Sequence, residues 1–317
     1  MAAAPTLRPT DLFSKEEWTG LRRRSNVFGL GMVVHCWVVI FGAIALSVWQ
    51  PWLIILAVPI IGARQLGLAV LMHEAAHGGL HSNGRVNDWV GHWLVGAPVG
   101  ASLKSYRPYH LKHHKYGQQA EDPDLGLAAH FPITKASLRR KIIRDLTGQT
   151  FYKQRVNQIA NAFGLKLRPG KGNENRVTDA REAAFPFLFT NLVLLIGLSL
   201  AGVWWAYFVL WLLPMATWNQ MVTRLRNIAE HAVLPHNDTA MGLARTTRAN
   251  LLERALIAPY WVNYHCEHHM FMHLPCYRFP AAHKLLHSKG LTEKMEIKNG
   301  YLTVLNIASS RPMGATV

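Results

Sequence analysis

The sequence predicts an all-α integral membrane protein: four transmembrane helices, arranged as two hairpins, and a cytoplasmic helical cap that holds a histidine-rich di-metal site. Three observations predict this fold. Long apolar runs carry almost no charge over the length of a membrane span. Three histidine clusters stand at the ends of these runs or in the polar segments beyond them, and basic residues gather in the same segments.

The first predicted hairpin is formed by two apolar runs near the N-terminus. Residues 27–48 contain no Asp, Glu, Lys or Arg and are long enough to cross a hydrocarbon core of about 30 Å. A turn at Pro51 leads into a second span over residues 52–72, which Arg64 and Gln65 interrupt. Because a cation inside a span is costly unless it is paired or hydrated, we expect Arg64 to pair within the bundle or to meet a polar substrate group.

The second predicted hairpin comes from a longer apolar stretch. Residues 183–223 carry no charge over about 40 positions, twice the length of one span, and Gly202 lies near the middle. The stretch predicts spans over residues 185–201 and 203–222. The remaining segments, 73–182 and 223–317, would then form most of the cap.

The charge distribution predicts the orientation in the membrane. Residues 22–24 are three arginines that precede the first span, whereas the two short hairpin tips are uncharged. The positive side is the cytoplasmic side, so both termini and all three histidine clusters are expected there. The net charge is +16, and residues 101–181 alone hold 16 Lys or Arg against 6 Asp or Glu. This basic segment suits contact with anionic lipid or docking of an acidic redox protein, and a surface against a membrane argues against nucleic acid.

The histidine clusters are HEAAH at residues 73–77, HLKHH at 110–114 and HCEHH at 265–269. Two of them share the spacing HxxHH. In a helix, residues four apart lie on one face and can chelate one ion, whereas the adjacent pair diverges by about 100° and can reach two ions. With 17 histidines in 317 residues, the HxxxH spacing alone has little weight, but the set of three clusters indicates a site for more than one metal.

A further candidate, His231, follows the fourth predicted span and lies four residues after Asn227, on the same helical face. It brings the number of imidazoles to nine, enough for four or five on each of two ions. The candidate ligands are His73, His77, His110, His113, His114, His231, His265, His268 and His269.

Carboxylates beside the histidines are candidates to hold the second ring nitrogen of a metal-bound imidazole. They are Glu74, Glu230, Glu267, Asp122 and Asp124, and His81 is a further second-layer candidate. The alternative for each acid is an ordinary solvated surface residue.

Other functions fit part of this pattern. HEAAH also matches the zinc-protease motif HExxH, with Glu74 as general base, but a protease site would leave both HxxHH clusters without a role. A metal transporter would line a path across the bilayer, whereas these clusters crowd one side. Imidazole ligands suit iron, copper or zinc. A location beneath apolar helices favours a lipid-like chain, whose inert C–H bonds need a strong oxidant, and this points to iron and dioxygen.

The three boxes, in this order, resemble those of the membrane fatty acid desaturase superfamily. The flanking strings YRPYHLKHHKYG, EDPDL, RNIAEH and NYHCEHHMF are similar to its bacterial members, and the match runs over residues 70–283. The resemblance implies one domain over residues 1–317 in the bacterial inner membrane, with two iron ions held by the nine histidines and Asn227 near the second iron through water. Dioxygen would be the co-substrate, and a methylene of a fatty acyl or other lipid would lose hydrogen.

The sequence also departs from the family pattern. Box one is HxxxH rather than the HxxxxH of acyl-CoA desaturases, which weakens the case for an acyl-CoA substrate. No cytochrome b5 is fused, so we expect electrons from a separate carrier such as ferredoxin or a cytochrome b5 system, held by the basic cap. Relatives with these boxes include hydroxylases and carotenoid ketolases. Whether the reaction gives an alkene or an alcohol depends on how the substrate carbon is placed, and we favour a desaturase.

Overall fold

The computed structural model describes residues 4–165, 176–235 and 239–312, and this part is mostly helical. The N-terminal half contains η1 (Pro9–Asp11), α1 (Lys15–Arg22), α2 (Asn26–Trp49), η2 (Pro51–Leu53), α3 (Ile54–Ala76), α4 (Gly84–Trp89), η3 (Val90–Gly96), η4 (Ala97–Val99), α5 (Leu103–Tyr116), α6 (Leu125–Ala128), α7 (Lys135–Leu146) and α8 (Gln149–Ala162). The η elements are short 3-10 or π helices.

The C-terminal half contains α9 (Arg176–Leu200), η5 (Tyr207–Leu212), α10 (Leu213–Ala216), α11 (Trp218–His231), β1 (Arg245–Arg248), α12 (Leu251–Leu256), η6 (Pro259–Trp261), α13 (His265–Met270), η7 (Cys276–Arg278), α14 (Phe279–Ser288), η8 (Leu291–Lys294), β2 (Glu296–Asn299) and α15 (Tyr301–Ala308).

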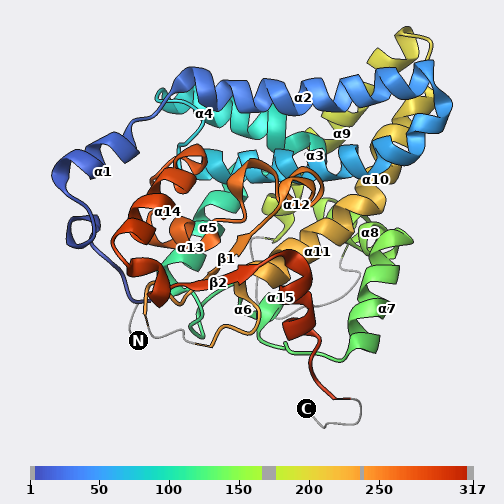
Figure 1. Cartoon of the computed structure of the whole chain (residues 1–317). Helices are drawn as coiled ribbons and strands as arrows, with labels where there is room; N and C mark the ends of the chain where they lie inside the picture. Colours follow the sequence, from blue (N-terminus) through green and yellow to red (C-terminus); the bar gives the residue numbers. More distant parts are fainter. Residues whose placement is uncertain (1–3, 166–175, 236–238, 313–317) are drawn as a thin grey trace.

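The first hairpin consists of α2 and α3, which run side by side with η2 at the tip (Figure 1). Ser25 begins α2, and its hydroxyl accepts a hydrogen bond from the Phe28 amide at 3.2 Å. Cys36, Ile40 and Ile44 are buried at four-residue intervals, so one stripe of α2 packs inward. The other faces of α2 remain apolar and exposed, as expected for a helix in lipid.

Three helical segments are long and apolar enough to span a membrane in the part of the chain that the structure describes. They are Asn26–Trp49, Pro51–Ala76 and Ala180–Leu200. The first two match the predicted first hairpin, and the third matches the predicted span 185–201. In α3 the helix continues to Ala76, so box one begins inside the same helix that forms the span.

The predicted span 203–222 is an interrupted segment rather than one continuous helix. It consists of the π-helical η5, the short α10 and the first residues of α11. Pro214 has no amide hydrogen to donate, and the backbone of Thr217 leaves helical geometry at φ −120° and ψ −86° before α11 begins. The sequence predicted the apolar character of this segment but not its break.

The structure also contains a small β-sheet, which the all-α prediction missed. Strands β1 and β2 pair in parallel, with Arg245 opposite Glu296. Each strand has only four residues and no long apolar run, so neither carries a clear sequence signal. The buried Arg245 guanidinium donates to the carbonyls of Ala229 and Ala232 at 3.1 and 2.9 Å, which joins the sheet to α11.

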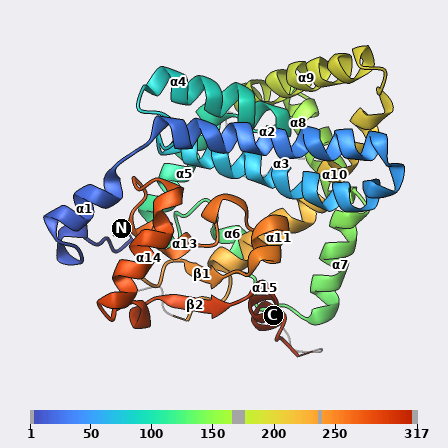
Figure 2. The ribbon, with the colours of Figure 1, turned by 45° about the horizontal axis from the view of Figure 1, so that its top comes forward.

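Helix α3 lies at the centre of the fold and packs against α2, α5 and α11. Figure 2 shows α2, α3 and α9 on one side of the molecule and α13, α14, β1 and β2 on the other, with α5 and α11 between them. The C-terminal half of α3 is buried almost without interruption from Ile61 to Ala76. The last turn of α3 therefore enters the region where α5, α11 and α13 converge, and the histidines lie there.

Candidate metal centre

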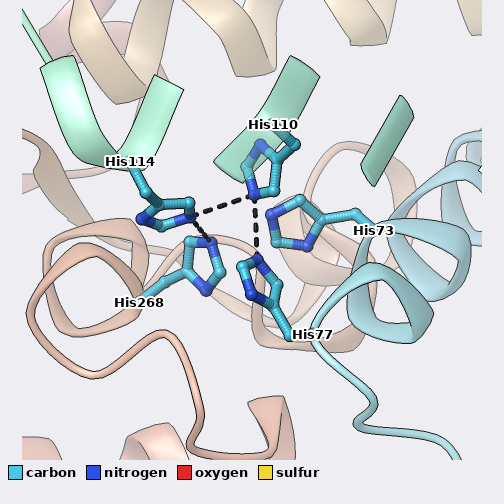
Figure 3. Close-up of side chains that lie close together, drawn as sticks. All are labelled: His73, His77, His110, His114 and His268. Carbon is cyan, nitrogen blue, oxygen red and sulfur yellow. Dashed lines mark hydrogen bonds between the residues drawn. The ribbon is translucent and has the colours of Figure 1, made fainter. Parts of the chain in front are cut away.

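All nine candidate histidines lie in this region, in two groups. The ring nitrogens of each group lie within 4.8 Å of one another. The first group contains His73, His77, His110, His114 and His268 (Figure 3), and the second contains His113, His231, His265 and His269. One group of five and one of four agree with the number expected for two ions.

Helical spacing explains how the two HxxHH boxes divide. In α5, His110 and His114 are four residues apart and share the first group, whereas His113 belongs to the second. In α13 the assignment is reversed: His265 and His269 share the second group, and His268 belongs to the first. The 100° step between adjacent residues thus separates the adjacent pair of each box, as the sequence predicted.

The nitrogen positions of the first group fit one metal ion. The His110 Nε2 atom lies 2.9 Å from His77 Nε2 and 3.0 Å from His114 Nε2, and His114 Nε2 lies 2.9 Å from His268 Nε2. Two nitrogens that are each about 2.1 Å from one ion and at right angles would lie about 3.0 Å apart. The fifth member, His73, has a buried Nε2 atom with no hydrogen-bond partner in the described structure.

The second group has the same spacing. The Nε2 atoms of His265 and His231 are 2.9 Å apart, and those of His113 and His269 are 3.2 Å apart. In this group too, the Nε2 atoms converge. The donor set is therefore entirely imidazole, and no cysteine belongs to either group. Such a set fits a borderline metal such as iron, copper or zinc.

Burial lowers the pKa of most of these imidazoles and so favours the neutral form, which is the form that binds metal. Burial, assisted by the nearby charges of His273, Arg107 and Arg24, lowers the pKa of His77 to about 3. Burial and nearby charges also hold the pKa well below its ordinary value in His110, His114, His231, His265, His268 and His269.

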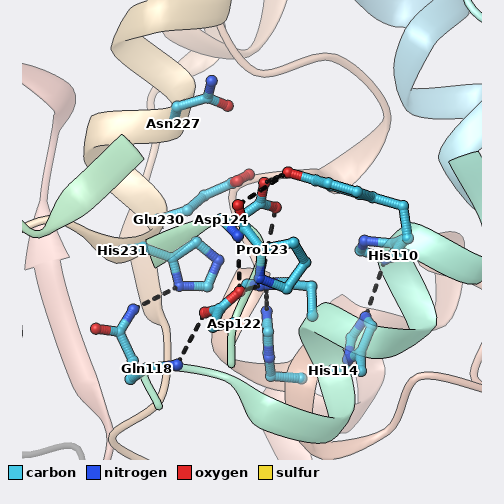
Figure 4. Close-up of polar contacts among 12 residues, drawn as sticks. His110, His114, Gln118, Asp122, Pro123, Asp124, Asn227, Glu230 and His231 are labelled. Atoms are coloured by element: carbon cyan, nitrogen blue, oxygen red, sulfur yellow. Dashed lines mark hydrogen bonds and ion pairs between the residues drawn. The ribbon is translucent and has the colours of Figure 1, made fainter. Parts of the chain in front are cut away.

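Asp122 fixes the orientation of His113. Its Oδ1 atom lies 2.7 Å from His113 Nδ1, and its carboxylate also accepts the amides of Gln118 and Asp124 at 2.9 Å each (Figure 4). Burial alone would raise the pKa of Asp122, but these hydrogen bonds outweigh it and lower the pKa. The ionised carboxylate keeps the proton on Nδ1, so His113 presents Nε2 as an acceptor toward its group.

Glu230 has a similar position beside His265. Its Oε1 atom lies 3.4 Å from His265 Nδ1, and it forms an ion pair with Arg226 one turn earlier in α11. Burial raises the pKa of Glu230 to about 8, although Arg226 opposes this shift. Asn227 accepts a 3.3 Å hydrogen bond from Arg226 and lines a cavity of about 30 Å³ that His231 also lines. This volume is enough for one water molecule.

Other candidates adjacent to the boxes have different partners. The Glu74 carboxylate accepts the Cys276 amide at 3.1 Å, and the Glu267 carboxylate contacts the Thr246 hydroxyl and His283 Nδ1 at 2.5 Å each. The residue next to a histidine in a helix points about 100° away from it, so sequence adjacency does not bring these acids to the clustered ring nitrogens.

The last two candidates also lie outside the two groups. His81 Nδ1 accepts the Asn83 amide at 3.0 Å. Asp124 accepts the Tyr109 hydroxyl at 2.5 Å, and its nearest group histidine is His113, with Asp124 Oδ2 3.8 Å from Nδ1.

The geometry does not favour the zinc-protease interpretation of HEAAH. A protease would need Glu74 free beside a metal held by three ligands. Here His73 and His77 are two members of a group of five, and Glu74 turns toward the loop after α13.

Three further residues near the histidines were not predicted from the sequence. Arg226 pairs with Glu230, Gln118 Nε2 lies 3.4 Å from His231 Nδ1, and the Tyr106 ring stacks on His110 with centroids 5.1 Å apart. Helical spacing was the available signal for two of them, because Tyr106 precedes His110 by four residues and Arg226 precedes Glu230 by four. Gln118 lies after the end of α5, where no periodic pattern places it.

Comparison with known proteins agrees with this geometry. Residues 47–296 match the family model described as fatty acid desaturase. The chain is 26% identical over 242 residues to a dihydrorhizobitoxine desaturase of Bradyrhizobium elkanii, covering 74% of this chain and 68% of that protein. It is 23% identical over 248 residues to an sn-1 oleoyl-lipid 12-desaturase of Arthrospira platensis, covering 72% of this chain and 66% of the relative. With the family model matching most of its length, the chain belongs to the fatty acid desaturase family.

Proposed function

We propose that the protein is an oxygen-dependent lipid desaturase of the membrane, which inserts a double bond into a fatty acyl or similar chain. The family is one of oxidoreductases. The observation that carries the proposal is the pair of imidazole groups, five and four, whose Nε2 atoms converge at the spacing expected for metal ligands. A hydrolase with one metal would have no use for the second group.

The residues present fit two iron ions, and all nine histidines would hold them. Bound iron would supply, with dioxygen, the oxidising power that removal of hydrogen from an inert methylene requires. Burial favours the neutral form of imidazoles such as His110, and Asp122 holds the His113 proton on Nδ1. Asn227 and the small cavity beside it would hold a water near the second group.

The membrane arrangement is also part of the proposal. Three long apolar helices and the interrupted segment of η5, α10 and early α11 would give four crossings. The side chains of Leu192, Val193 and Ile196 on α9 are about half exposed, as expected for a surface that meets lipid. The histidines, at the cap end of α3, would face the cytoplasm of a bacterial inner membrane, where an apolar substrate chain can approach from the bilayer.

Electrons would come from a separate acidic carrier such as a ferredoxin or a cytochrome b5 system. Helix α7 offers a basic face for docking, because Arg139, Arg140 and Arg144 are exposed on it. Complementary charge would accelerate the encounter and make it sensitive to salt.

The decisive experiment combines metal analysis with mass spectrometry of lipids from cells that express the protein and a suitable reductase. We expect about two irons per chain and a product lighter than its substrate by the mass of two hydrogens. A product heavier by one oxygen would assign a hydroxylase or ketolase instead. One zinc per chain, with turnover that does not need oxygen, would refute the proposal.

A matched pair of histidine variants tests the site. His268→Ala removes a member of the first group and should abolish turnover while the protein remains in the membrane. His81→Ala alters a histidine outside both groups and should keep both the metal and the activity. If both variants lose activity alike, the loss reports damage to the fold rather than to the metal centre.

A further inference from the structure

A large groove lies outside the metal centre, between the first hairpin and the segment that precedes box three. Its volume is about 850 Å³, within the range of ligand sites, and no histidine of either group lines it. Its walls come from α2, α3, α12 and η6, and they are mostly apolar. Its polar lining includes Arg64, Arg254, His35 and Tyr260. The lining therefore combines apolar walls with two cations, and it contains no carboxylate.

Arg64 is the unusual residue of this groove. It lies inside the α3 span, its exposed fraction is 8%, and no carboxylate lies within ion-pairing distance of it in the described chain. Its guanidinium donates to the Ala255 carbonyl at 2.8 Å and lies 5.5 Å from the centre of the Tyr260 ring. These contacts satisfy part of the hydrogen-bonding capacity of the guanidinium group, but no anionic side chain among the described residues neutralises its positive charge. A buried, uncompensated cation that lines a cavity favours an anion there.

The backbone beside Arg64 is held in an uncommon conformation. Tyr260 and Trp261 both have positive φ, 53° and 57°, which is costly for aromatic residues. This conformation turns the Tyr260 ring between α2 and α3, where its hydroxyl lies 3.1 Å from His35 Nδ1 and its ring packs against Gly67. The strained turn thus supports the polar end of the groove beside Arg64.

The rim of the groove is apolar and exposed. Val27 and Leu251, which line it, are 85% and 82% exposed, and Phe28 is 46% exposed. Apolar side chains this exposed on a membrane protein mark a lipid-facing surface. An occupant would therefore enter from the bilayer with its apolar chain along α2 and its charged end at Arg64 and Arg254.

We propose that this groove binds an anionic membrane phospholipid, with the phosphate at Arg64 and Arg254. The nearest acidic residue in sequence, Glu253, is engaged elsewhere, because its carboxylate accepts the amides of Asn250 and Tyr301. The groove therefore presents positive charge to a headgroup, and a zwitterionic lipid would gain less from it. This lipid site does not depend on the proposed desaturation, and its test needs neither metal nor turnover.

The test is native mass spectrometry of the full chain, released from detergent that contains equal amounts of phosphatidylglycerol and phosphatidylcholine with the same acyl chains. The protein should retain phosphatidylglycerol preferentially. Arg64→Gln should weaken that binding by roughly 30-fold or more, as expected when one partner of a buried charge pair is removed.

A pair of glycine variants keeps the test independent of Arg64 and of folding. Gly31 lines the groove, and a Cβ atom there meets no atom within 4 Å, so Gly31→Trp should fill the groove and displace the lipid without disturbing α2. Gly42→Trp on the same helix meets equally open space away from the groove and should leave binding unchanged. Equal retention of the two lipids by the unaltered protein would overturn the proposal. Undiminished phosphatidylglycerol binding in Gly31→Trp would also overturn it.

Discussion

Replacing Asp122 with asparagine is expected to weaken metal binding in the second histidine group while leaving the first group loaded. Asp122 contacts His113, a member of the second group, through a 2.7 Å hydrogen bond at Nδ1. Asparagine has nearly the same size, so the change removes charge and acceptor capacity without opening a cavity. No other acidic residue lies as close to His113, because Asp124 is 3.8 Å away.

The size of the effect follows from the three hydrogen bonds that Asp122 accepts. If the asparagine oxygen keeps those from His113 and the Asp124 amide, its NH₂ group must face the Gln118 amide, which is also a donor. One buried donor left unpaired costs about 1–3 kcal/mol of folding free energy. Loss of a carboxylate behind a metal-bound histidine typically lowers metal affinity by 10- to 100-fold, or about 1.4–2.7 kcal/mol.

The assay is iron content after dialysis against increasing concentrations of a chelator. Unaltered protein should release its two ions at similar chelator levels, whereas Asp122→Asn should release one ion at a level 10- to 100-fold lower. Asp145→Asn is the matched control, because Asp145 is a buried carboxylate that pairs with Arg224 and belongs to neither histidine group. It should lower stability and keep both ions. Equal release of both ions from Asp122→Asn would refute the assignment of Asp122 to one group.

Three further predictions concern packing, acid and the protease interpretation. A Cβ atom at Gly29 would lie 2.1 Å from the Leu80 carbonyl oxygen, so Gly29→Ala should lower the thermal unfolding temperature by an amount equivalent to about 1–3 kcal/mol or more. Gly42→Ala, where a Cβ atom meets open space, should be neutral or stabilising. Equal unfolding temperatures for the two variants would contradict this packing. The folded state lowers the pKa of the buried imidazoles, whereas the unfolded chain protonates them near pH 6.5. The free energy of unfolding of metal-free protein should therefore fall as the pH drops below 6.5, by about 1 kcal/mol for each such histidine down to pH 5.5. Scanning calorimetry in detergent measures this change, and a profile that does not vary with pH would mean that the imidazoles were already charged in the folded state. In Glu74→Gln the glutamine oxygen can still accept the Cys276 amide, so the variant should keep its metal and its turnover. A loss of activity above 100-fold would instead support Glu74 as a general base.

The sequence predicted the grouping of the histidines more completely than the fold around them. The division of each HxxHH box between two groups follows from the helical repeat alone, since His113 and His268 point away from their four-residue partners. His231 could be added because it follows an apolar run at the same helix end. These inferences depend only on local helical geometry, and helices do form at α5, α11 and α13.

Features that depend on tertiary contacts were beyond the sequence. The partner of Glu267 is His283, and that of Glu74 is the Cys276 amide, 202 positions away; neither choice has a local signal. The strands β1 and β2 lie about 50 residues apart, and the hydrogen bond from Arg245 to the Ala229 carbonyl, which joins the sheet to α11, has no local signal in the sequence. The break before α11 depends on Thr217, whose backbone conformation follows from its surroundings rather than from residue type.

The distribution of the histidines along the chain has a consequence for biogenesis. Each group includes a residue of α13: His268 in the first, and His265 and His269 in the second. Neither group is therefore complete until the ribosome has synthesised the chain beyond residue 269. Under the proposed function, α3, which carries box one on the same helix as a candidate membrane span, would already have been inserted by then. Metal would therefore be acquired late, after membrane insertion, and a chain truncated before α13 would have neither group assembled.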